Sequence, residues 1–283
     1  MISPAIAPPL VETRDPVAQL LRDLVHDKTG AFFETDRLGS LMEKLQPLAG
    51  SYGCRTFLDY YYVLKYDDPN GIQLKRLLDA ISVQETFFWR ESDQLRALTD
   101  RVAPAWFKQT SKPLRIWSAA CASGEEPYSI AIALREAGLS SHPIEILGSD
   151  ASEAALAAAR TAVYRERSFR TLSHALREKY FHKVEGGHRL THDIVSKVQF
   201  RWANLMKLED LTESAGAQVV FCRNVFIYFS PTSIQKVLSH MSNILPRGGY
   251  LFTGASESLF NVTRHFELND LGGAFVYMRN SRP

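Results

Sequence analysis

The sequence predicts an α/β fold in which a mainly parallel sheet follows a small all-helical domain. Over residues 11–82 the apolar residues recur only at helical spacing. From about Leu114 short apolar segments alternate with helical ones, which is the pattern of a parallel sheet. With 283 residues and 45% hydrophobic content, the chain has room for two domains.

Residues 1–82 are expected to form the helical domain. Asp15-Pro16 reads as a cap followed by a proline at the first helical position, and this first helix should end at Gly30. Three further apolar faces predict helices around Leu38–Leu45, Phe57–Leu64 and Ile72–Leu78. Residues 83–113 should form a linker that contains a helix from Leu95 to Lys112.

Residues 114–283 are expected to form the sheet domain. Strands are predicted near residues 114–118, 144–149, 197–202, 217–222, 249–254 and 274–278. Residues 164–198 interrupt this rhythm with a helix (Ser173 to Phe181), a turn at Gly186-Gly187 and two short alternating stretches. This segment, called the insertion below, is predicted to be a small antiparallel β-subdomain.

The segment Arg115–Leu134 passes from a strand, through a loop of small residues, directly into a helix. Small side chains let backbone N–H groups approach a ligand, and a helix N-terminus supplies partial positive charge. The loop has no Gly-x-Gly-x-x-Gly and no Walker lysine, and Glu125 with Glu126 would repel a pyrophosphate. A ligand that carries a cation and a ribose suits this loop, so S-adenosylmethionine fits and NAD fits poorly.

Asp150 ends the second strand, about 25 residues after the loop, near the offset at which an acidic residue binds a ribose hydroxyl in βαβ sites. Taken alone, Asp150 reads as a helix N-cap, and Glu125 reads as a solvated carboxylate in a first helical turn. The two together favour a ligand site.

Composition excludes several classes. A net charge of +2 is too small to indicate a nucleic-acid-binding protein, and the sequence contains no apolar run long enough to cross a bilayer. Three separated cysteines without a Cys-x-x-Cys pair indicate a reducing cytoplasm and no zinc site. His188 and His192 are four residues apart, but Gly186-Gly187 makes a helix there unlikely, so they are not expected to bind a metal. The insertion is rich in arginine and lysine, which indicates either an ordinary solvated surface or a docking patch for an acidic partner.

Four motifs occur in order along the chain: residues 85–91 (Glu-Thr-Phe-Phe-Trp-Arg-Glu), 117–129 (Trp-Ser-Ala-Ala-Cys-Ala-Ser-Gly-Glu-Glu-Pro-Tyr-Ser), 221–229 (Phe-Cys-Arg-Asn-Val-Phe-Ile-Tyr-Phe) and 248–257 (Gly-Gly-Tyr-Leu-Phe-Thr-Gly-Ala-Ser-Glu). Together they resemble the CheR family, the chemotaxis-receptor glutamate O-methyltransferases. The resemblance covers nearly the whole chain. It implies a Rossmann-like S-adenosylmethionine methyltransferase domain with the β-subdomain inserted and the helical domain in front.

The resemblance also implies the roles of individual residues. In the cofactor site, Thr86 and Arg90 would contact the methionine end, Glu125 the amino group, Asp150 the ribose, Asn204 and Leu205 the adenine edge, and Arg223 and Asn224 the surroundings of the methyl group. Gln84 stands where the family usually has asparagine and is a further candidate. Arg223 and Tyr228 are the catalytic candidates. Alternative readings are that Thr86 caps the linker helix, that Arg90 pairs with Glu91 or Asp93, and that Tyr228 belongs to the core.

The implied reaction transfers the methyl group of S-adenosylmethionine to glutamate side chains in the cytoplasmic helical region of membrane chemoreceptors. A glutamate is already ionised at neutral pH, so no general base is needed, and no metal is expected. The expected protein is cytoplasmic and monomeric, is not inserted in the membrane, binds no nucleic acid and, because the turn Glu185–His188 is short, works without a receptor tether peptide. Two other functions remain open: a cofactor-sensing adaptor without turnover, and an RNA methyltransferase.

Overall fold

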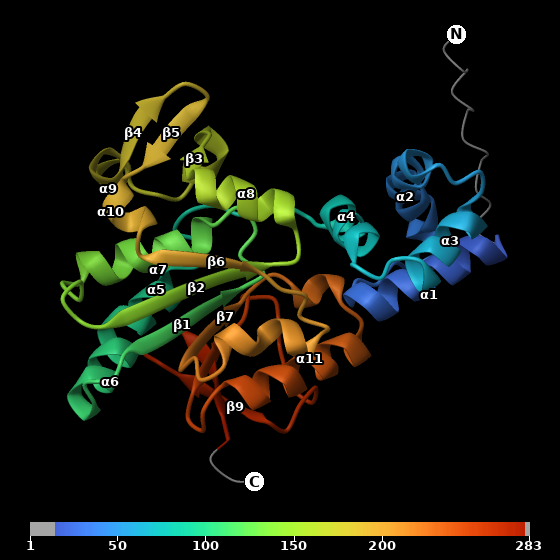
Figure 1. Cartoon of the computed structure of the whole chain (residues 1–283). Helices are drawn as coiled ribbons and strands as arrows, with labels where there is room; N and C mark the ends of the chain where they lie inside the picture. The colour runs from blue at the N-terminus through green and yellow to red at the C-terminus, as the bar shows by residue number, and fades with distance from the viewer. Residues whose placement is uncertain (1–14, 281–283) are drawn as a thin grey trace. The chain divides into compact units, whose positions relative to one another are not determined.

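The structure is a computed structural model in which residues 15–280 are described, and the chain divides into two compact units, residues 1–82 and 83–283 (Figure 1). The first unit consists of helices in its described part: α1 (Pro16–Thr29), a short 3₁₀ turn η1 (Thr35–Arg37), α2 (Leu38–Tyr52), α3 (Phe57–Tyr66) and α4 (Ile72–Ile81). The Asp15 side chain accepts the Val17 N–H at the start of α1, and Gly30 ends that helix in the left-handed conformation. The start and end signals in the sequence therefore act as expected.

The second unit contains two sheets. Its strands are β1 (Leu114–Ala119), β2 (Ile144–Asp150), β3 (Val163–Tyr164), β4 (Phe181–Val184), β5 (Gly187–Leu190), β6 (Val198–Trp202), β7 (Val219–Cys222), β8 (Tyr250–Phe252), β9 (Phe266–Asp270) and β10 (Phe275–Arg279). The larger sheet has the order β6-β2-β1-β7-β8-β10-β9. Its first five strands run parallel, whereas β10 pairs antiparallel with both β8 and β9. The predicted α/β fold class is confirmed.

Helices and short turns connect these strands. They are α5 (Ser92–Ala97), η2 (Leu98–Val102), α6 (Ala103–Gln109), α7 (Glu125–Glu136), α8 (Glu153–Thr161), η3 (Glu166–Phe169), α9 (His174–Tyr180), α10 (His192–Val195), η4 (Leu208–Ser214), η5 (Phe226–Tyr228) and α11 (Pro231–Ile244). The linker helix differs from the expectation because it begins at Ser92, passes through the π-helical turn η2 and ends at Gln109. No helix among the described residues combines the length and apolar character that a membrane span needs.

Strand β9 was missed by the sequence analysis. Only Phe266 of its five residues is buried, because β9 is the outer strand of the sheet. Its sequence, Phe-Glu-Leu-Asn-Asp, alternates apolar and polar residues at the first four positions, but this short alternation does not mark a buried face, because Leu268 is exposed as well.

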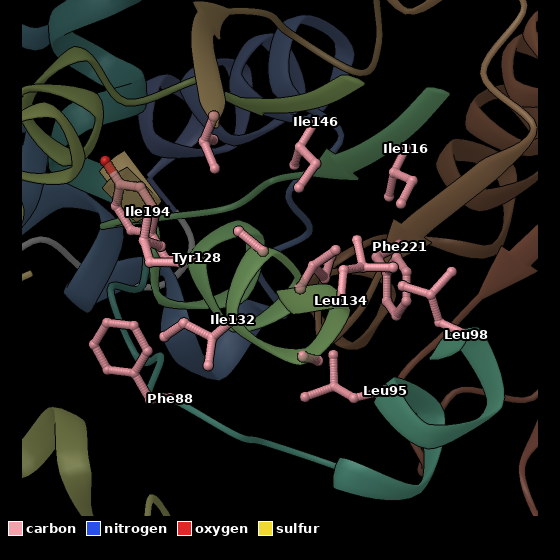
Figure 2. Packing of buried hydrophobic residues seen from close by; sticks show 14 of the residues in the cluster. Phe88, Leu95, Leu98, Ile116, Tyr128, Ile132, Leu134, Ile146, Ile194 and Phe221 are labelled. Carbon is pink, nitrogen blue, oxygen red and sulfur yellow. The ribbon is translucent and has the colours of Figure 1, made fainter. Parts of the chain in front are cut away.

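The alternation of side chains along the central strands builds a core on each face of the larger sheet. Ile116 and Phe221 face the core that α7 covers, and their neighbours Trp117 and Val220 face the core that α11 covers. Figure 2 shows the first of these cores, with the α7 side chains packed against the labelled strand residues. The sheet is thus covered on both faces, and in open α/β folds of this kind ligands bind at the carboxyl ends of the strands.

The insertion forms the smaller sheet, with the order β3-β5-β4 and antiparallel pairing throughout. Its base is an aromatic cluster in which Phe88 from the linker contacts Tyr164, Phe169 and Phe181, with ring centroids 4.8, 5.7 and 4.9 Å from that of Phe88. Phe88 is completely buried. The linker and the insertion are therefore packed together as one piece of structure.

Candidate cofactor site

The candidate site lies where four adjacent parallel strands end. The sheet order places β6, β2, β1 and β7 side by side, and their carboxyl ends lead into Asn204, Asp150, the loop 120–124 and Arg223, respectively. These four segments are far apart in the sequence but meet at one edge of the sheet. This edge is the usual ligand-binding position in open α/β folds.

The loop between β1 and α7 has an unusual backbone. Ala120, Ala122 and Gly124 all adopt positive φ angles, at 57°, 47° and 90°. At Gly124 an added Cβ would lie 2.9 Å from the Cβ of Ala159 and 3.2 Å from the ring of Phe200. Only glycine satisfies both the φ angle and the close packing at this position. The loop is therefore held tightly against α8 and β6.

Asp150, at the end of β2, binds this loop directly. Its Oδ2 accepts the backbone N–H of Ala122 at 2.8 Å, and its Oδ1 accepts the N–H of Ser152 at 2.8 Å. Ser152, and not Asp150, is the N-cap of α8, because its hydroxyl accepts the N–H of Ala155. Each oxygen of an ionised carboxylate can accept more than one hydrogen bond, so these contacts are compatible with hydroxyl donors from a ligand.

Glu125, the first residue of α7, is buried and not solvated. Its carboxylate accepts hydrogen bonds from Ser123 Oγ at 2.7 Å and from Ser168 Oγ at 2.9 Å. Burial raises the pKa of Glu125, and the two serine hydrogen bonds and the charge of Arg167 act in the opposite direction. Ser168 belongs to the insertion, so this carboxylate connects the loop with the β-subdomain.

Arg223 lies between two carboxylates. Its Nη2 is 3.2 Å from Glu91 Oε2, its Nη1 is 3.3 Å from Glu126 Oε2, and only 2% of its side chain is exposed. Nη2 also donates to the backbone carbonyl of Arg90 at 2.7 Å. Burial raises the pKa of Glu126, whereas the charge of Arg223 lowers it. Arg223 therefore connects the end of β7 to the linker at Arg90 and Glu91.

The linker reaches the site in a constrained conformation. Trp89 and Glu91, on either side of Arg90, have φ angles of 66° and 52°. The Trp89 N–H donates to Ser129 Oγ, and the Phe88 N–H donates to the Ser168 carbonyl. A non-glycine residue in this region costs about 1–3 kcal/mol, so the surrounding contacts must fix Arg90 in place.

The side chain of Arg90 lies with its guanidinium 5.2 Å from the centre of the Phe87 ring and donates to the Glu85 carbonyl. Neither Glu91 nor Asp93 takes part in these contacts. The N-cap position of α5 belongs to Glu91, so Thr86 does not cap that helix. Thr86 is half-buried, and Gln84 is exposed.

The remaining predicted residues flank these groups. Asn204 is buried after β6, and its Oδ1 accepts the N–H of Met206. The carbonyl of Leu205 lies 3.0 Å from His240 Nδ1. Asn224 follows Arg223 with a φ of 58°, and Tyr228 ends the turn η5 with 40% of its surface exposed. Tyr228 is thus at the surface and not in the core.

The sequence analysis assigned no role to two residues at this edge. Ser168, which binds Glu125, lies in the insertion, and serine is too common there to give a signal. Glu257, a buried carboxylate, accepts the N–H of Asn224 at 2.7 Å. Its signal was a glutamate in a glycine-containing loop after a strand, at the end of the motif formed by residues 248–257.

Metal-ligating residue types and cavities elsewhere in residues 15–280 do not add to this site. No group of three or more His, Cys, Asp or Glu side chains in this range could hold a metal ion. Two cavities border the amino halves of β1 and β2, where Ile144, Ile146, Ser196 and Lys197 line both of them. None of the predicted site residues lines either cavity, so the candidate site is separate from both of them.

The sequence that forms this edge of the sheet matches proteins of known family. Residues 84–273 match the family model described as "CheR methyltransferase, SAM binding domain". Chemotaxis protein methyltransferase 2 of Vibrio cholerae is 32% identical over 251 residues, which cover 87% of each chain. Chemotaxis protein methyltransferase 1 of Pseudomonas aeruginosa is 31% identical over 92% of this chain and 96% of its own. The matched region contains every predicted site residue, and the chain belongs to the CheR family of S-adenosylmethionine-binding methyltransferases.

Proposed function

We propose that this protein transfers the methyl group of S-adenosylmethionine to glutamate side chains in the cytoplasmic helical region of chemoreceptors. The products would be glutamate methyl esters and S-adenosylhomocysteine. The observation that carries this proposal is the match to chemotaxis protein methyltransferases along nearly the whole chain. The protein would act in the cytoplasm as a monomer.

The residues at the sheet edge fit this cofactor. Two carboxylates, Glu125 and Asp150, border a loop of small residues, and these hydrogen-bond acceptors suit an amino group and a ribose better than they suit phosphates. Asp150 would bind the ribose and Glu125 would lie near the amino group. Asn204 and Leu205 would border the adenine, Thr86 and Arg90 would bind the methionine end, and Asn224 would lie beside the methyl group. Gln84 is the weakest of these assignments because it is exposed.

When bound, the cofactor supplies an electrophilic methyl group on a positively charged sulfur. A substrate carboxylate oxygen would form a bond to that methyl carbon as the carbon–sulfur bond breaks, with the electron pair of the broken bond left on sulfur. A glutamate with a pKa of about 4.3 is ionised at neutral pH, so no proton has to move. The task of this chain is to align the carboxylate and exclude water, effects that can contribute about 7–11 kcal/mol.

The two catalytic candidates have different surroundings. Arg223 is already paired with Glu91 and Glu126, and it holds the carbonyl of Arg90. These contacts support a positioning role for Arg223, in which it keeps Arg90 at the cofactor, over direct contact with the substrate. Tyr228 is exposed beside Asn224, which supports contact with an incoming glutamate.

The receptor would dock on the exposed cations of the insertion. Several of these cations have acidic partners: Arg177 pairs with Glu166, Lys179 with Glu136, and Arg170 with Glu85. Within the described part of the chain, the exposed cations of the insertion that enter no such pair are Arg165, Arg167, Lys183, Arg189 and Lys197. Cations without acidic partners attract the glutamate-rich helices of a receptor more strongly, so these residues are the proposed docking group.

The two other candidate functions remain distinguishable. A cofactor-sensing adaptor needs the same cofactor residues but would release no product. An RNA methyltransferase would need a basic surface larger than a net charge of +2 provides. Neither is favoured by an observation at the site.

The test is transfer of tritiated methyl groups from S-adenosylmethionine to chemoreceptor-containing membranes, followed by treatment with alkali. Release of volatile methanol is expected, because esters hydrolyse in alkali. Alkali-stable label would refute glutamate esterification, and tight cofactor binding without transfer would favour the adaptor.

A paired variant tests docking. Lys183→Glu with Arg189→Glu should reduce methylation of membranes while leaving S-adenosylhomocysteine affinity unchanged. The control, Lys236→Glu with Arg264→Glu, makes the same change in charge at exposed positions outside the insertion. Equal losses in both double variants would mean that net charge, and not the insertion, attracts the receptor.

A further inference from the structure

The segment from Arg223 to Tyr228 carries three predicted site residues but has little regular structure of its own. It leaves β7, turns through Asn224 in the left-handed conformation and forms the single 3₁₀ turn η5. An asparagine tolerates this conformation better than most residues, but it does not enforce it. Contacts from outside the segment must therefore decide its shape.

Glu257 supplies these contacts. Its Oε2 accepts the N–H of Asn224 at 2.7 Å, and its Oε1 accepts the N–H of Ile227 at 3.3 Å. Asn224 and Ile227 thus share one carboxylate, and this fixes the start of the segment and the turn that carries Tyr228.

The same carboxylate is anchored in the loop after β8. Oε2 also accepts the N–H of Gly254 at 2.7 Å, the Glu257 N–H donates to the Gly254 carbonyl, and the Thr253 hydroxyl donates to the Glu257 carbonyl. A Cβ on Gly254 would lie 2.6 Å from Asn224 Nδ2 and 2.9 Å from Glu257 Oε2. Glycine at this position therefore lets the two loops close on the carboxylate.

Glu257 has the environment of a buried anion held by backbone dipoles. Only 6% of the residue is exposed, and among residues 15–280 no lysine or arginine forms an ion pair with it. Three N–H groups that point at one carboxylate are the arrangement that stabilises a buried negative charge.

We propose that Glu257 is a positioning residue, which holds Asn224 and the Tyr228 turn in the geometry needed for methyl transfer. The proposal rests on the methyltransferase function proposed above. Glu257 is not a catalytic residue in this account, because it acts only through the backbone of segment 223–228.

Glu257→Gln tests this role with the smallest change in shape. The glutamine oxygen can replace Oε2 and keep the bonds to Asn224 and Gly254, but its amide then faces the N–H of Ile227, donor against donor. The Tyr228 turn should loosen while the cofactor loop stays intact. Glu267→Gln, at an exposed position on β9, is the matched control.

Three measurements are needed: amide hydrogen exchange, kcat and cofactor-product affinity. Amide hydrogen exchange of a peptide spanning residues 222–229 should become at least about tenfold faster in Glu257→Gln, and kcat should fall about tenfold, since small displacements near reacting groups can cost up to about 100-fold. S-adenosylhomocysteine affinity should change less than about threefold. Glu257→Asp, which keeps the charge on a shorter side chain, should lose kcat in the same way if it folds.

Unchanged hydrogen exchange would overturn the proposal, because Glu257 would then not hold the segment. A fall in kcat that only tracks the loss of folded protein or of cofactor affinity would also overturn it, since the role would be merely structural. An inactive wild-type protein would instead refute the proposed function, and the exchange measurement would still decide whether Glu257 anchors the segment.

Discussion

Replacing Gly124 with alanine is expected to destabilise the second unit by about 2–5 kcal/mol. The left-handed backbone at this position accounts for about 1–2 kcal/mol. The added Cβ would lie 2.9 Å from Ala159 and 3.2 Å from Phe200, and overpacking of this kind costs about 1–3 kcal/mol. The sum of these two costs gives the expected range.

Gly138→Ala is the matched control for this variant. Gly138 also has a positive φ angle, 74°, but a Cβ added there would meet nothing within 4 Å. Its expected cost is therefore only the backbone contribution of about 1–2 kcal/mol. Both glycines lie in the second unit, so the same unfolding transition reports on both.

Urea unfolding followed by circular dichroism measures the two free energies, and calorimetry with S-adenosylhomocysteine measures the effect on the loop. The Gly124 variant should lose at least about 1 kcal/mol more than the Gly138 variant. Equal losses in the two variants would refute the argument that the loop is packed tightly against α8 and β6.

Three further predictions concern other residues. Asp150→Ala should weaken S-adenosylhomocysteine binding by about 100-fold in calorimetry, since it removes a charged acceptor, and unchanged affinity would exclude the ribose assignment. Hydrogen bonds from Lys179 and Tyr180 lower the pKa of Glu136 below its usual value of 4.5. These bonds therefore stabilise the folded state fully above pH 4.5, and their stabilisation is lost as the pH falls through the lowered pKa. Glu136→Gln should therefore lower the free energy of unfolding in urea at pH 7 by at most about 1 kcal/mol after allowance for solvent screening. The difference from wild type should narrow below pH 4.5, and a constant difference would contradict this. Cys121 and Cys222 are buried and their pKa values are raised by burial, so a thiol reagent should label only the half-buried Cys54 in the native protein, and labelling that survives Cys54→Ser would show otherwise.

Local patterns in the sequence were sufficient for most of the fold. The Asp15-Pro16 cap and Gly30 delimit α1, and the alternation at Ile116 and Trp117 builds the two faces of the sheet. Strand β9 was not predicted because its residues are mostly exposed. The linker was predicted as a single helix because hydrophobic spacing does not reveal a π-helical turn.

The candidate site was predicted as a set of residues but not as a set of contacts. Strand order brings Asp150 beside the loop, and a strand-ending aspartate is visible in the sequence. The pairing of Arg223 with the carbonyl of Arg90 joins residues 133 positions apart, and the bond from Asn224 to Glu257 spans 33 positions. Such contacts depend on tertiary packing, which no local pattern records.

The aromatic cluster around Phe88 has a consequence for how relatives of this protein can diverge. The base of the insertion is shared with the linker, so changes in length near Tyr164 or Phe169 would displace Arg90 as well. The hairpin tip at Glu185 and Gly186 has no such tie, because it is exposed and an added Cβ on Gly186 meets nothing within 4 Å. Evolution can therefore lengthen or recharge the tip to suit a new partner, while selection on the cofactor site keeps the base unchanged.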